Sequence, residues 1–182
     1  MIISYETLRN RTDWLTTVPP GVLQSEYRDE AADLFVLLEA NPTMADGNPA
    51  FGAGNSAAGA LDFATLLALF RAQKVRGGER VLGSEPRYLV TPAAQELAMR
   101  KELKAADLSD SIEVISRADV SNLYLIGDPI ISPCLFRVGL TEIPNLSVRT
   151  VPRGAGDVAV TCEDAYIFSV GSRYGICRMT PT

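Results

Sequence analysis

Residues 23–38 carry apolar side chains at helical spacing, and the helix that they predict constrains the fold more than any other feature. Its apolar positions are Leu23, Tyr27, Ala31, Leu34, Phe35 and Leu38, while acidic side chains occupy other faces. At 1.5 Å per residue this helix is about 22 Å long. It ends at Asn41, because a residue that precedes proline avoids the helical region. On its other side, Pro19-Pro20-Gly21 is expected to break the chain.

The next segments are expected to form a loop and then two further helices. Residues 41–60 are rich in Gly, Ala, Asn and Pro and are predicted to be an irregular loop. Asp62 is placed to cap a helix that Gly77-Gly78 terminates. The apolar stripe of this helix consists of Phe63, Leu66, Leu67 and Phe70.

A strand at residues 88–90 precedes the third helix. Thr91 is suited to its N-cap and Pro92 to its first helical position, and the helix is expected to run to about Ala106. After residue 110 the pattern becomes strand-like, with turn residues between the apolar segments. These segments are residues 112–115, 123–126, 135–138, 158–161, 166–170 and 174–177. Because helices come early and strands late, the sequence favours an α+β fold over alternating α/β.

Charge and composition exclude several classes of partner. The net charge is −5, and residues 1–60 alone hold eight acidic side chains against three arginines. This distribution argues against tight nucleic-acid binding, which requires clustered Lys and Arg. No apolar run approaches the roughly 20 residues of a membrane span, and the first residues do not form a secretory signal. Cys134, Cys162 and Cys177 lack paired spacing, so we expect buried, reduced thiols in an intracellular setting.

The residue types needed for common catalytic sites are missing or misplaced. The chain has no histidine, which removes Ser–His and Cys–His nucleophiles and His-containing zinc sites. Asp29, Glu30 and Asp33 are best explained as a solvated helix face, although carboxylate or Lys catalysis is possible in principle. The segment Gly52-Ala53-Gly54-Asn55-Ser56-Ala57 imitates a dinucleotide fingerprint, but no strand leads into it. Asp46-Gly47 lacks the oxygen ligands of a calcium loop. We therefore expect no cofactor and no metal.

Phe51 stands alone among small residues and has two interpretations. It either anchors the loop to the core of its own chain or inserts into a neighbouring subunit, since buried aromatic residues dominate interface energetics. The sequence leaves both open.

Several of these segments, taken in order, carry a family resemblance. The helix ends with Ala32-Asp33-Leu34-Phe35-Val36-Leu37-Leu38, and Asn41-Pro42-Thr43-Met44-Ala45-Asp46-Gly47 and Pro49-Ala50-Phe51 follow it. The strand–helix unit at residues 86–96 and the tail around Ile143-Pro144 and residues 157–177 continue the pattern. Over residues 20–178 the chain resembles the Mu-like head-subunit branch of tailed-phage major capsid proteins, which share the Hong Kong 97-type fold.

The resemblance implies a domain arrangement and a structural function. Residues 22–40 would form the spine helix, residues 1–61 and 131–182 the peripheral domain, and residues 62–130 the axial domain. The chain would be a non-enzymatic virion subunit that assembles in the bacterial host cytoplasm into pentamers and hexamers of an icosahedral capsid. It would enclose DNA without sequence-specific binding or contact with a membrane. Its partners would be copies of itself, with scaffold, portal or decoration proteins as possible additions. Candidate contacts between subunits are Asn41, Pro42, Met44, Asp46 and Phe51.

The chain also departs from the family pattern. Gly52-Ala53-Gly54-Asn55 stands where family members commonly place histidines, and only about twenty residues precede the spine. Most of the N-terminal arm and extended loop would be lacking, so we expect a fragment or a short form. Two alternatives to a phage capsid are an encapsulin-like bacterial compartment shell and a small-molecule enzyme that uses carboxylates.

Overall fold

A computed structural model describes residues 2–3, 14–74, 85–128, 134–139, 145–150, 158–163 and 166–182. The chain divides into two compact units. The first comprises Met1–Leu34 and Arg137–Ile167, and the second comprises Phe35–Phe136 and Phe168–Thr182. These boundaries differ from the expected divisions after residues 61 and 130. The assignment of a peripheral and an axial domain stays a prediction.

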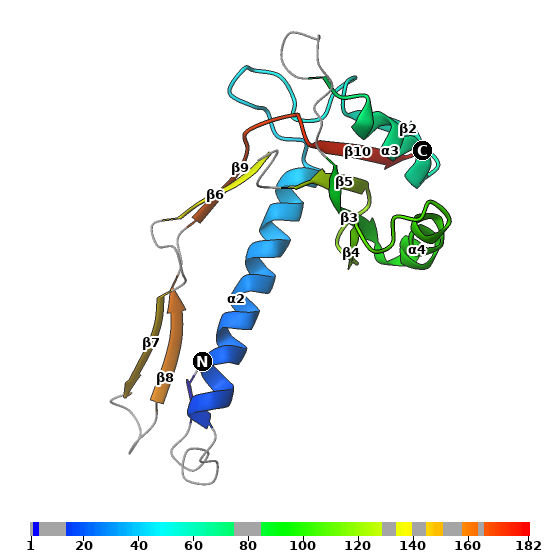
Figure 1. The fold of residues 1–182 in the computed structure, drawn as a ribbon. Helices are drawn as coiled ribbons and strands as arrows, with labels where there is room; N and C mark the ends of the chain where they lie inside the picture. Colours follow the sequence, from blue (N-terminus) through cyan, green and yellow to red (C-terminus); the bar gives the residue numbers. More distant parts are fainter. Residues whose placement is uncertain are drawn as a thin grey trace. The chain divides into compact units, whose positions relative to one another are not determined.

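The long helix predicted from the apolar spacing is present but starts earlier than expected. Helix α2 spans Trp14–Glu39 and is drawn in blue in Figure 1. It continues through Pro19-Pro20-Gly21, so the expectation that this segment breaks the chain is wrong. The fixed φ of proline is itself helical, and both prolines lie near the start of the helix. There they cost the hydrogen bonds to the carbonyls of Leu15 and Thr16 without stopping the helix.

Strands β6 to β9, together with a short strand near the N-terminus, form two small sheets. The strands β1 (Ile2–Ile3), β8 (Val158–Glu163) and β7 (Asn145–Thr150) make an antiparallel three-stranded sheet in that order. The strands β6 (Leu135–Gly139) and β9 (Tyr166–Val170) make a two-stranded sheet. The strands predicted at 135–138, 158–161 and 166–170 are thereby confirmed.

The second unit is built on a mixed five-stranded sheet. Its order is β2 (Ser56–Gly59), β10 (Ile176–Pro181), β5 (Leu123–Gly127), β3 (Pro86–Pro92) and β4 (Glu113–Arg117). The outer pairs β2–β10 and β3–β4 are parallel, and β5 runs antiparallel to both of its neighbours. Figure 1 shows β2 beside β10 at the C-terminal end of the chain. Strand β2 was not predicted, since small residues carry little strand signal and it forms by pairing with a distant segment.

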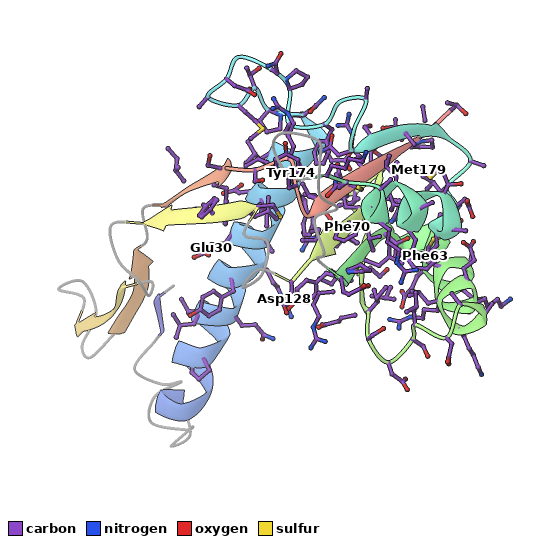
Figure 2. All side chains as sticks on the ribbon, turned by 45° about the horizontal axis from the view of Figure 1, so that its top comes forward. Glu30, Phe63, Phe70, Asp128, Tyr174 and Met179 are labelled. Atoms are coloured by element: carbon purple, nitrogen blue, oxygen red, sulfur yellow. The ribbon has the colours of Figure 1, made fainter. Side chains whose placement is uncertain are left out.

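Two helices cover one face of this sheet and close the hydrophobic core. Helix α3 spans Phe63–Arg71, and α4 (Glu96–Ala105) follows the 3-10 turn η1 (Ala93–Gln95). Alternate residues of the strands point at the helices, as the pleat requires. The cluster contains Phe63, Leu66, Phe70, Leu89, Met99, Leu103, Ile112, Leu123, Leu125, Cys177 and Met179. Figure 2 labels Phe63, Phe70 and Met179, which bring α3 and β10 into this core.

The helix boundaries test the capping and terminating residues that the sequence predicted. The side chain of Asp62 accepts a hydrogen bond from the backbone N–H of Thr65, which confirms the predicted cap. Thr91 is not an N-cap, because β3 continues to pair with β4 through Pro92 and the Thr91 side chain is buried. Helix α3 ends at Arg71, before the expected Gly77-Gly78.

The described cysteines agree with the predicted free thiols. Cys134 and Cys177 are buried and unpaired, and Cys162 lies in β8 with a side chain outside the described residues. Burial raises the pKa of the thiol to about 11 at Cys134 and to about 12 at Cys177. Among the described residues, no helix combines the length and the apolar character that a membrane span requires. The α+β class is confirmed.

Candidate functional site

The predicted contact residues lie on the segment that leaves α2, residues 41–55, which we call the post-helix loop. Asn41 ends the helix with a φ of 51°, a left-handed conformation that asparagine tolerates better than most residues. Its side chain then holds Phe51 at two points. The backbone N–H of Phe51 donates to Asn41 Oδ1 at 2.8 Å, and Asn41 Nδ2 donates to the Phe51 carbonyl at 3.2 Å. One residue therefore both stops α2 and closes the loop.

The rim of the loop is fixed by an ion pair to the turn before β10. Arg173 donates from both terminal nitrogens to the carboxylate of Asp46 and from Nε to the Pro49 carbonyl. The backbone N–H of Asn48 donates to the same carboxylate at 3.0 Å. The Arg173 hydrogen bonds, followed by the one from Asn48, hold the pKa of Asp46 well below its usual range. Asp46 is thus charged and already paired within its own chain.

Phe51 lies inside the second unit. Its side chain is 3% exposed, and its ring centroid is 5.6 Å from that of Tyr124 on β5. The Arg178 guanidinium lies 4.7 Å from the Phe51 centroid, within the range of a cation–π contact. The position of Phe51 is therefore that of a residue that anchors the post-helix loop to the core of its own chain. A further role in contacts between subunits stays a prediction.

Two buried amides fasten the loop and α3 to the same turn. Asn55, 3% exposed, donates to the carbonyls of Ala50, Arg173 and Ile176. Gln73, 5% exposed, donates to the Ile176 carbonyl at 2.9 Å and accepts from the Gly175 N–H at 2.8 Å. Buried amides are costly unless they are paired, so these two residues fix the geometry around them.

A hollow of about 930 Å³ lies between the post-helix loop, the end of α3 and the turn at residues 171–174. Among the described residues that line it, Asp46 is the sole carboxylate, and Arg173 neutralises it. The lining therefore lacks the pair of carboxylates that acid–base hydrolysis would use. In the described part of the chain, no group of three His, Cys, Asp or Glu residues is placed to hold a metal ion.

Glu39 joins the last turn of α2 to the sheet. Its carboxylate accepts hydrogen bonds from the backbone N–H groups of Ser121 and Asn122, the Ser121 hydroxyl, Asn122 Nδ2 and the Tyr124 hydroxyl. Burial by itself would raise the pKa of Glu39, but these hydrogen bonds outweigh it, and the pKa lies below its usual range. Burial, together with the negative charge of Glu39, raises the pKa of Tyr124.

The structure gathers the five predicted contact residues on one loop but gives them different surroundings. Asn41 and Phe51 make internal contacts, Asp46 is exposed and ion-paired, and Pro42 and Met44 are partly exposed. Four residues that shape this region were not predicted from the sequence: Glu39, Asn55, Gln73 and Arg173. The sequence places the Glu39 carboxylate at the end of the helix, just before Asn41-Pro42. The hydrogen-bond partners of Glu39, however, lie more than eighty positions away in the sequence. The Gly52–Gly54 segment forms a turn closed by Asn55 Oδ1, with strand β2 after it.

Comparisons with known proteins found a matching family model and similar solved structures. A family model described as phage capsid protein matches residues 1–179. Among solved structures, a phage-related protein from Bordetella bronchiseptica RB50 is similar with a TM-score of 0.51 and 9% sequence identity. The similar region covers 72% of this chain and 56% of that one, so this chain spans little more than half of its length. At that identity the likeness concerns the fold alone. No curated protein matches the chain.

Proposed function

The chain belongs to the phage capsid protein family, and from this premise we propose that it assembles with copies of itself into the pentamers and hexamers of an icosahedral phage head. The family match over residues 1–179 carries the proposal. A phage capsid protein is a structural part of the virion. We propose that assembly takes place in the host cytoplasm, with scaffold, portal or decoration proteins as further partners, and that the shell encloses DNA.

The finer assignment is the Hong Kong 97-type fold and its Mu-like branch. In this proposal α2 is the spine, residues 62–130 form the axial domain, and residues 1–61 and 131–182 form the peripheral domain. The order of elements supports it, since a long helix precedes a helix-covered sheet and further strands follow. Strand β10, at residues assigned to the peripheral domain, pairs with β5 of the axial domain, so the two proposed domains share one sheet.

The post-helix loop is proposed as a contact surface between subunits. Asn41 and Phe51 shape the loop from within, while Pro42, Met44 and Asp46 are accessible to a neighbour. A loop held by Asn41, Asn55 and Arg173 loses little conformational freedom on binding, which favours repeated association. Many weak contacts become effective when each subunit touches several others.

A structural rather than enzymatic role agrees with the family and with the lining of the hollow. Acid–base catalysis needs an ionisable group that is free to exchange protons near a substrate. In the described lining of the hollow, Asp46 is held by Arg173, and Gln73 hydrogen-bonds the turn before β10 and the Cys177 thiol. These contacts stabilise the fold and leave no pair of free carboxylates in that lining.

Electron microscopy and analytical ultracentrifugation of the purified chain test the function. We expect closed particles or ring-shaped capsomers, with assembly that increases steeply with concentration. A chain that stays monomeric at every concentration, alone and with the proteins encoded beside it, would contradict the proposal. The contents of particles purified from a host distinguish the alternatives, since nuclease-protected DNA supports a virion and an enclosed enzyme supports a bacterial compartment.

A further inference from the structure

Two exposed helix faces of opposite charge occur on this chain. On α2, Asp29, Asp33 and Val36 occupy one exposed face, which we call the acidic stripe. On α4, Leu97, Lys101 and Lys104 occupy another, with Arg100 at its edge, which we call the basic stripe. Both sets follow the i, i+4, i+7 spacing that places residues on one side of a helix.

Each stripe carries an apolar residue at one end that is left in solvent. Val36 is 66% exposed and Leu97 is 68% exposed, and both are among the most exposed large apolar residues of the described chain. The buried side of α4 points away from its stripe, through Met99 and Leu103. The exposed face of α4 is therefore not required for the core.

Most charged side chains of the two stripes form no ion pair within the described residues. Within the described residues, Lys101, Lys104 and Asp29 form no ion pair, whereas Arg100 pairs with Glu96 on its own helix. Asp33 accepts a hydrogen bond from the Tyr166 hydroxyl at 2.7 Å and remains exposed. The acidic stripe thus offers two carboxylates, and the basic stripe offers two ammonium groups without a described partner.

The spacing of the stripes matches to within one residue when the helices run antiparallel. Val36 then faces Leu97, Asp33 faces Lys101 and Asp29 faces Lys104. Each stripe extends over seven helical positions, which is about 10 Å at 1.5 Å per residue. Opposite charges at matched positions fix register and orientation, and the apolar pair at one end excludes the reversed alignment.

We propose that the basic stripe of α4 is a docking surface for the acidic stripe of α2 in a second copy of this chain. The proposal rests on self-assembly as the proposed function and names two faces through which it occurs. The contact is heterologous, because the two faces differ, and heterologous contacts are the kind that build rings. Each exposed ion pair contributes little alone, and repetition over many copies makes the sum effective.

Charge reversal tests the pairing. Asp29→Lys with Asp33→Lys is one variant, and Lys101→Glu with Lys104→Glu is the other. Each is expected to weaken association at least about tenfold, because like charges then face one another. Mixing the two variants, or combining all four substitutions in one chain, is expected to restore association. Increasing salt should weaken the wild type and the restored pairs alike.

Matched controls separate pairing from net charge and from folding. Asp110→Lys with Glu113→Lys, and Lys74→Glu with Arg87→Glu, change the net charge equally at exposed positions outside the stripes. Tyr166→Phe removes the hydrogen bond to Asp33 without a change in charge. These variants should associate as the wild type does, and thermal unfolding confirms that every variant is folded.

Disulfide cross-linking tests the docking contact independently of shell assembly. One full-length chain carries Asp29→Cys and another carries Lys104→Cys, and oxidation of the mixture should produce a linked dimer well above the wild-type background. Linkage without particles would support the docking surface and overturn the proposed shell function. Particles whose assembly ignores both charge reversals would overturn the docking surface and leave the function standing. Neither linkage nor particles would overturn both.

Discussion

The carboxylate of Glu39 accepts a hydrogen bond of 2.9 Å from the hydroxyl of Tyr124. Glu39 is the last residue of α2, and Tyr124 lies in β5, in the middle of the five-stranded sheet. Together with Ser121 and Asn122, this contact fixes the end of the long helix to the sheet through a partly buried charge. Removal of that charge leaves several donors without an acceptor.

Glu39→Gln should therefore destabilise the isolated chain by about 1–2 kcal/mol, the lower part of the range for charged hydrogen bonds, since Glu39 is only partly buried. The free energy of unfolding in urea measures the loss. Glu113→Gln, at an exposed position of β4, is the matched control and should have little effect. Equal losses of stability in both variants would show that the hydrogen-bond network around Glu39 does not account for the loss.

The same carboxylate should make stability depend on pH in the acid range. The pKa of Glu39 is lower in the folded chain than its ordinary value of 4.5. A group with a depressed folded pKa stabilises the fold above its unfolded pKa, and this contribution disappears as the pH falls through the folded pKa. Between about pH 5 and pH 3, the wild type should lose more stability than Glu39→Gln. Parallel pH profiles of the two proteins would contradict this assignment.

The side chain of Asn41 should matter more than its backbone conformation. Asn41→Gly keeps the left-handed φ but loses both hydrogen bonds to Phe51, whereas Asn41→Ala also strains the backbone. We expect losses of about 1–2 kcal/mol for the glycine variant and about 1 kcal/mol more for the alanine variant. Hydrogen exchange of the Phe51 N–H should accelerate in both. Unchanged exchange would show that the clamp does not hold the loop.

Local sequence signals predicted the elements whose partners lie nearby. The helix over residues 23–38 follows from its apolar spacing, and the Asp62 cap needs a donor only three positions away. The features that were missed depend on distant partners. Strand β2 pairs with β10, and Gln73 binds a turn about a hundred positions later. The hydrophobic periodicity of the sequence does not predict such pairings, because they form between segments that tertiary packing brings together. The loop was identified as important, but the internal role of Arg173 was not.

Phe51→Ala separates the two interpretations of this aromatic residue. The ring packs on Tyr124 and beneath Arg178, so its removal should leave a cavity and destabilise the isolated chain by about 3–5 kcal/mol. Phe51→Leu should cost less, since it keeps part of the volume. Urea unfolding of the monomeric fraction gives both values. If Phe51→Ala keeps its stability and loses only association, the residue is a contact between subunits rather than a core anchor.

Gly171 allows the close approach of the Phe136 ring, and a larger residue should disrupt it. A Cβ built at Gly171 collides with the edge of that ring, while the Gly171 N–H donates to the Cys134 carbonyl at 2.9 Å and holds the backbone in place. Because the backbone cannot retreat without breaking this bond, Phe136 must move. Gly171→Ala should cost about 1–3 kcal/mol, as overpacking does.

Phe136→Ala makes room for the added methyl group. The Phe136 side chain is already 44% exposed, so its own removal should cost less than the loss of a core aromatic residue. The double variant should then be more stable than the sum of the two single losses predicts, by about 1 kcal/mol or more. A double-mutant cycle in urea measures this coupling. Additive losses would mean that the alanine at position 171 acts on the backbone and not on the ring of Phe136.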